Sequence, residues 1–162
     1  MVVGEDSLPA VYGTVVILDL DRFKEYTIQQ GFNAYKPNIV TGTLSHLVLD
    51  VASKRTGSIL YGLDWDRGTE EAIIVFPGME SLQVKEDLLS IAKEICELGA
   101  SITIVALHEA IITPGRVSQR KLRRIFKREF SILERLKHRG GGLVYIDGEI
   151  FHICKRPCLG IE

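Results

Sequence analysis

The sequence has few cysteines and no long apolar run, and each absence limits what kind of protein it encodes. Only three of its 162 residues are cysteine, so the disulfide framework of a small secreted domain is not expected. The longest apolar runs, such as 15–18 and 72–76, are far too short to cross a bilayer. No basic segment followed by an apolar core is readable as a secretory signal. We therefore expect a cytoplasmic protein in a reducing environment, with no membrane partner.

The composition is that of an ordinary globular protein. Hydrophobic residues make up 46% of the chain and charged residues 25%, which excludes a disordered or collagen-like chain. The length favours one domain, and no repeat or linker divides the chain. We expect a single domain over residues 1–162, with a core at about 13–148 and a C-terminal strand and tail at 149–162.

Charge is distributed unevenly along the chain. The formal net charge is −1, but residues 116–139 contain ten Lys or Arg against only Glu129 and Glu134. A basic helix on an acidic body suggests an anionic ligand, a nucleic acid or an acidic partner surface. The alternative is a solvated helix face whose charges pair with the protein's own acids.

Hydrophobic periodicity predicts an alternation of strands and helices. The expected strands are 13–20, 58–63, 71–76, 102–107, 143–146 and 149–153, and the expected helices are 37–53, 81–97 and 118–139. The first strand is apolar on both faces, which is typical of a central, doubly covered strand. The order predicts an α+β fold of the ferredoxin-like (split βαβ) type. Its antiparallel sheet would be backed by helices on one face, with an added C-terminal basic helix and hairpin.

Acidic residues gather where the first strand ends. Asp19 and Asp21 flank Leu20, and strand alternation places the two aspartates on the same side. The turn of the neighbouring hairpin carries four further acids, Asp64, Asp66, Glu70 and Glu71. Converging carboxylates favour a hard cation such as Mg²⁺ or Mn²⁺, which also engages nucleotide phosphates. The alternative is a surface hairpin with solvated acids.

Three segments resemble motifs of the GGDEF-type nucleotidyl cyclases. Residues 18–32 (LDLDRFKEYTIQQGF) resemble the first motif, D-x-D-x-F-K. Residues 68–78 (GTEEAIIVFPG) are similar to the signature hairpin, and 134–148 (ERLKHRGGGLVYIDG) to the A-K-x-x-G-R-N stretch and final strand. They occur in family order. The wider group is the nucleotidyl cyclase and polymerase palm superfamily, with archaeal GTP cyclohydrolase III and the palm domains of CRISPR polymerases.

The resemblance implies a palm domain that handles nucleoside triphosphates with Mg²⁺ or Mn²⁺. Asp19 would be the first metal ligand, helped by the Leu20 carbonyl, and Glu70 or Glu71 would supply the second carboxylate. The implied catalytic carboxylates are Asp19, Asp21, Glu70 and Glu71. The implied nucleotide-binding residues are Lys24, Thr27, Lys137 and Arg139, with Thr27 standing where the family has a base-reading Asn. Such cyclases often work as dimers, so a homodimer is expected.

Several alternatives stay open at this point. Asp64 competes with Glu70 and Glu71 as the partner of Asp19, because residues 61–65 (YGLDW) also resemble the hairpin signature. The protein could be a purine nucleotidyl cyclase, a related NTP-converting or GTP-hydrolysing enzyme, or a catalytically lapsed module that senses a nucleotide or binds a partner. It could also be a ferredoxin-like domain that binds nucleic acid through the basic helix 116–139.

Overall fold

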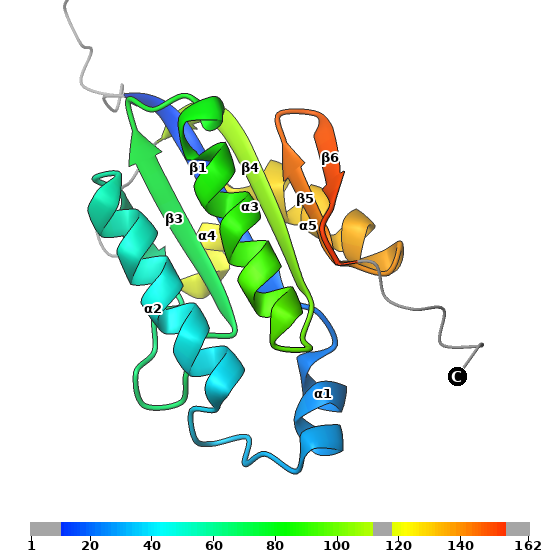
Figure 1. Cartoon of the computed structure of the whole chain (residues 1–162). Coiled ribbons are helices and arrows are strands. Elements are labelled where there is room, and N and C mark those ends of the chain that lie inside the picture. Colours follow the sequence, from blue (N-terminus) through cyan, green and yellow to red (C-terminus); the bar gives the residue numbers. More distant parts are fainter. Residues whose placement is uncertain (1–10, 112–117, 155–162) are drawn as a thin grey trace, which may run out of the picture.

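The computed structural model describes residues 11–111 and 118–154 of the chain (Figure 1). The described elements follow one another as β1 (Val11–Leu20), α1 (Phe23–Gln30), α2 (Ile39–Lys54), β2 (Ser58–Tyr61), β3 (Glu71–Pro77), α3 (Ser81–Glu97), β4 (Ile102–Ile111), α4 (Gln119–Ile125), α5 (Lys127–His138), β5 (Leu143–Ile146) and β6 (Glu149–His152). None of these helices is long and apolar enough to cross a membrane.

The strands form one six-stranded sheet in the order β2-β3-β1-β4-β5-β6. β1 lies between β3 and β4 and is antiparallel to both. The order of the first four strands is that of the ferredoxin-like fold, so the predicted α+β class is confirmed. The sheet is not antiparallel throughout, because β4 and β5 run parallel. The chain returns between them through α4 and α5, as a parallel pair requires a crossover connection.

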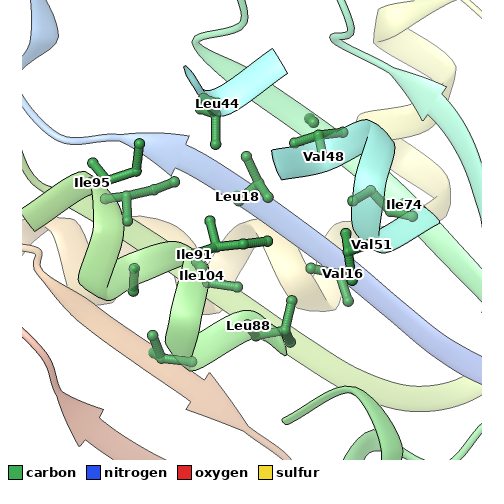
Figure 2. Close-up of a cluster of buried hydrophobic side chains, with 14 of the residues drawn as sticks. Val16, Leu18, Leu44, Val48, Val51, Ile74, Leu88, Ile91, Ile95 and Ile104 are labelled. Carbon is green, nitrogen blue, oxygen red and sulfur yellow. The ribbon is translucent and has the colours of Figure 1, made fainter. Parts of the chain in front are cut away.

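Helices cover both faces of the sheet (Figure 1). Val16 and Leu18 of β1 pack with α2 and α3 in one apolar cluster, part of which is drawn in Figure 2. Val15 and Ile17 point the other way and pack with apolar residues of α4 and α5 in a second cluster. The expectation of helices on one face only was therefore wrong. The doubly apolar β1 is explained by the second layer, since both of its faces are removed from water.

Two features of the helices differ from expectation. The basic helix predicted over 118–139 is broken at Phe126, a buried residue with φ −102° and ψ 38° that ends α4 and precedes α5. The short helix α1 was not predicted, because its only buried residue is Thr27 and it therefore has no apolar stripe. By contrast α3 has the predicted bounds, 81–97.

A disulfide joins Cys96, near the end of α3, to Cys154, which follows β6. The expectation that the cysteines would stay reduced is corrected here. The pair was not evident because the two residues are 58 positions apart in the chain. The third cysteine, Cys158, lies outside the described residues.

Candidate functional site

The end of β1 places an aspartate between two neighbouring strands. Asp19 is paired in register with Glu71 of β3 on one side and with Thr103 of β4 on the other. Directly opposed residues point to the same face of a sheet, and here it is the face that α5 covers. The register thus brings Glu71, and not Glu70, opposite Asp19.

Lys137 of α5 reaches this end of the sheet. Its Nζ lies 2.7 Å from Asp19 Oδ2 and 3.6 Å from Asp21 Oδ1, and it donates a hydrogen bond of 3.0 Å to the Leu20 carbonyl oxygen. Three oxygens from consecutive residues therefore surround one cation. We call this arrangement the cation seat, defined by Asp19, Leu20 and Asp21.

The two aspartates of the cation seat differ sharply in exposure. The Asp19 side chain is 28% exposed, whereas that of Asp21 is 3% exposed. Both Asp21 oxygens are engaged: Oδ2 accepts hydrogen bonds from Ser101 Oγ (2.7 Å) and Gly142 N (2.8 Å), and Oδ1 accepts one from Thr103 Oγ1 (2.6 Å). Such bonds stabilise a buried carboxylate and hold it in place.

The surroundings of Asp19 shift the pKa of its carboxyl group. Burial raises the pKa of Asp19 above its ordinary value, and the nearby carboxylates of Glu71 and Asp21 add to the rise. The hydrogen bond and charge of Lys137 oppose that rise. The pKa of the Tyr61 hydroxyl is also raised, by burial first and then by Glu71. A cation close to Asp19 is therefore what favours its ionised form.

The acids of the β2–β3 connection have several different roles. Asp64 Oδ1 accepts hydrogen bonds of 2.9 Å from the backbone N–H groups of Asp66 and Arg67, which shapes the turn. The Glu70 side chain is exposed, and its carbonyl oxygen accepts a hydrogen bond from Leu20 N (2.9 Å). Only Glu71 stands in register with Asp19.

A pocket of about 330 Å³ lies along this connection. Its lining residues are Tyr61, Gly62, Leu63, Asp64, Arg67, Gly68, Glu70 and Glu71. Three of the four acids of this connection, Asp64, Glu70 and Glu71, thus border a single hollow. Arg67 supplies a positive charge to the pocket, and its guanidinium lies 5.2 Å from the ring centre of exposed Tyr35.

The four residues expected to hold a nucleotide lie in different surroundings. Lys137 contacts both aspartates, as described. Lys24 on α1 and Arg139 at the end of α5 are exposed. Thr27 is buried, and its hydroxyl donates to the Phe23 carbonyl oxygen of its own helix (2.7 Å).

Sequence reasoning missed the residues that hold Asp21. Ser101 and Thr103 lie at the start of β4 and alternate with the buried Ile102 and Ile104. Two polar residues on one face of an otherwise apolar strand are a readable signal that this face meets a polar group.

The described residues contain no ready-made cluster of metal-binding side chains. Within residues 11–111 and 118–154, no three His, Cys, Asp or Glu side chains lie close enough together to hold a metal ion. The donors around the cation seat are two carboxylates and a backbone carbonyl, which is oxygen chemistry of the kind that Mg²⁺ and Mn²⁺ accept. In the structure the cation between them is the ammonium of Lys137.

Comparison with known proteins gives only distant likenesses among solved structures. No family model and no curated protein sequence matches the chain. Among solved structures, the chain is similar to the guanylyl cyclase Cya2 at 14% sequence identity, over 85% of this chain and 75% of that chain, with a TM-score of 0.39. The ferredoxin-like fold assigned above rests on the strand order of this chain, and the function is inferred from its own contacts.

Proposed function

We propose that the chain is a nucleotide-binding domain of the palm type that holds a nucleoside triphosphate together with Mg²⁺ or Mn²⁺ at the end of β1. The observation that carries this proposal is the cation seat, where Asp19 Oδ2 and the Leu20 carbonyl oxygen both lie within 3.0 Å of the Lys137 ammonium. A place that holds one cation through oxygens suits another cation with the same ligand preference.

The residues that would hold the metal are Asp19, the Leu20 carbonyl and Glu71, which stands across from Asp19. Mg²⁺ usually takes only one or two protein carboxylates and completes its shell with water and phosphate oxygens, so this small donor set fits it. When bound, the metal would neutralise phosphate charge and favour phosphoryl or nucleotidyl transfer. We propose Asp21 as a positioning residue, because its two oxygens are already engaged by three donors.

Lys137 has a second role in this proposal. Its ammonium holds the cation seat in the free protein, and on nucleotide binding it turns to the triphosphate as a point charge. The side chain is 27% exposed, so it borders solvent and can move without unpacking α5. Lys24 and Arg139 are exposed cations that could add phosphate contacts, and the expected homodimer stays a prediction that sedimentation would check.

Nucleotide binding as a function of metal tests the proposal. Titration of the protein with each of the four NTPs, with and without Mg²⁺ or Mn²⁺, should show metal-dependent affinity that Asp19→Asn lowers at least tenfold. Asp50→Asn, the same change at an exposed aspartate of α2, is the matched control and should bind like the parent. Mass spectrometry of the same mixtures would identify any product.

The possible results separate the alternatives. Metal-dependent affinity that survives Asp19→Asn would refute the assignment of the site. Nucleotide affinity that needs no metal and yields no product would replace the enzyme with a nucleotide-sensing module.

A further inference from the structure

Four cations outside the candidate site form a continuous surface. Arg120, Arg123 and Arg124 of α4 and Lys127 of α5 are all exposed, and together they line an open hollow of about 630 Å³. We call it the arginine surface. It shares no residue with the cation seat or with Lys137, and only Arg123 of the four also borders a small hollow with Tyr61 and Glu71.

The cations of the arginine surface are not neutralised by the protein's own acids. In the described ranges, the ion pairs of α5 are made by Arg128 with Glu109 and by Lys137 with the aspartates of β1. No ion pair within residues 11–111 and 118–154 uses any of the four surface cations. Their positive charge is therefore available to an external anion, contrary to a helix face that pairs with its own protein.

Buried apolar residues hold the helices of the arginine surface against the sheet. Leu122 and Phe126 are each 1% exposed and fix α4 to the sheet. Lys127 follows the helix break at Phe126 and lines the same hollow as the three arginines of α4. The Arg123 guanidinium lies 4.8 Å from the ring centre of Phe130, which restricts its motion and lowers the entropy lost on binding.

The chemistry of the surface selects its partner. The large exposed apolar residues of the described chain are Val11, Tyr12, Ile28, Tyr35, Ile39, Leu49, Trp65 and Leu82, and none of them belongs to α4 or α5. An amphipathic membrane-binding helix or a protein-docking helix would present apolar side chains beside its cations. A surface lined only by arginine and lysine side chains instead matches phosphate groups, which the guanidinium fork binds in a bidentate manner.

We propose that the arginine surface binds the phosphodiester backbone of a single-stranded nucleic acid. A flexible strand can turn several successive phosphates into a hollow, whereas a stiff duplex cannot follow it. Because the contacts are to phosphates, binding depends little on base sequence and strongly on salt.

Fluorescence anisotropy with a fluorescein-labelled 12-nucleotide oligouridine tests the proposal on the whole chain. For four phosphate contacts on a single strand, the logarithm of affinity should fall with the logarithm of salt with a slope of about −3. The double variant Arg120→Gln/Arg124→Gln should weaken binding at least tenfold at low salt and roughly halve the slope. Both side chains are exposed, so circular dichroism should show an unchanged fold.

Matched controls decide what the result means. Lys36→Gln/Lys93→Gln removes the same charge from exposed positions elsewhere and should bind like the parent. The proposal is overturned if the control loses as much affinity as the arginine variant, or if the labelled strand does not bind at low salt. It is also overturned if a duplex of the same length or a polyglutamate peptide binds as tightly as the single strand. If tripolyphosphate displaces the labelled strand at an equal concentration of phosphate groups, the surface binds free polyphosphate and the proposal of a nucleic-acid partner is overturned.

Discussion

The two ends of α5 meet carboxylates of the sheet in opposite ways. At its C-terminal end, Lys137 pairs with Asp19 and lies 3.6 Å from Asp21, so negative charge on the sheet is matched by an ammonium. At its N-terminal end, Glu129 is 0% exposed and lies beside a second carboxylate, that of Glu109. Burial first, and then the Glu109 carboxylate of β4, raises the pKa of Glu129 to about 8.

The difference shows two ways to keep acids in the interior. At the C-terminal end, the Lys137 ammonium offsets part of the rise that burial causes in the pKa of Asp19, and Asp21 accepts hydrogen bonds from Ser101, Thr103 and Gly142. At the N-terminal end, Glu129 is kept neutral by a proton, because burial and the Glu109 carboxylate outweigh the nearby charge of Arg128. Under the proposed function, the ammonium at the C-terminal end of α5 would give way to a metal ion beside Asp19. The protonated Glu129 at the N-terminal end carries no charge that would attract one.

The largest expected effect comes from removing the hydrogen-bonded acid. Asp21→Ala leaves three buried donors without an acceptor and should lower the free energy of unfolding by at least about 3 kcal/mol. Asp19→Ala removes a half-exposed acid and should cost about 1 kcal/mol or less. Urea unfolding of both variants measures the contrast. Equal losses would mean that the two aspartates have the same structural role.

Loss of the disulfide should come next. Cys154 lies next to Gly142, whose backbone N–H donates a hydrogen bond to Asp21. The disulfide between Cys154 and Cys96 closes a loop of 58 positions. The double variant Cys96→Ala/Cys154→Ala should lose about 3 kcal/mol of stability. Hydrogen exchange should become faster at the Gly142 amide and stay unchanged near Glu129. If exchange rises equally at both ends of α5, the disulfide does not act locally on the Asp21 end.

Removing the Lys137 ammonium should leave Asp19, like Glu129 at the other end of α5, with a raised pKa. In Lys137→Met, burial and the neighbouring carboxylates raise the pKa of Asp19 with no opposing cation. We expect a further rise in the pKa of Asp19, and a loss of stability at neutral pH that is recovered in acid as Asp19 takes up its proton. NMR titration of the Asp19 carboxyl carbon measures it, with Lys93→Met as an exposed control. An unchanged pKa would show that Lys137 does not hold the charge of Asp19.

The parts of the fold and the candidate site that could be predicted from the sequence are those that depend on residues close together in the chain. β1, β3 and α3 were predicted because apolar periodicity is a local signal. The ferredoxin-like order followed from those elements. The candidate site was predicted in part: Asp19 and Glu71 are brought together by the sheet register that the hairpin implies.

The remainder depends on contacts between distant parts of the chain. Ser101 is 80 residues from Asp21, and Lys137 is 117 residues from Leu20, so only the fold brings them into contact. The helix break at Phe126 was missed because apolar residues continue at helical spacing on both sides of it. The buried pairing of Glu129 with Glu109 was missed because a glutamate in a basic helix reads as a solvated charge.

The smallest effect at neutral pH, and the sharpest test of the comparison, is expected at Glu129. Its folded pKa of about 8 lies above the ordinary value of 4.5, so the folded state binds the proton more tightly than the unfolded state. The stability that the neutral acid contributes is fully present below about pH 4.5, and it is lost as the pH rises through about 8. The free energy of unfolding can fall by at most about 1.4 kcal/mol per pH unit in this window, because one proton is released.

Glu129→Gln keeps the shape of the side chain but does not titrate, so its stability should be flat across this window where that of the parent declines. Thermal unfolding of both proteins from pH 5 to 9 measures the difference, with Glu134→Gln, an exposed neighbour on α5, as control. A parent curve parallel to that of Glu129→Gln would mean that Glu129 is ionised in the folded protein and that the two ends of α5 hold their acids in the same way.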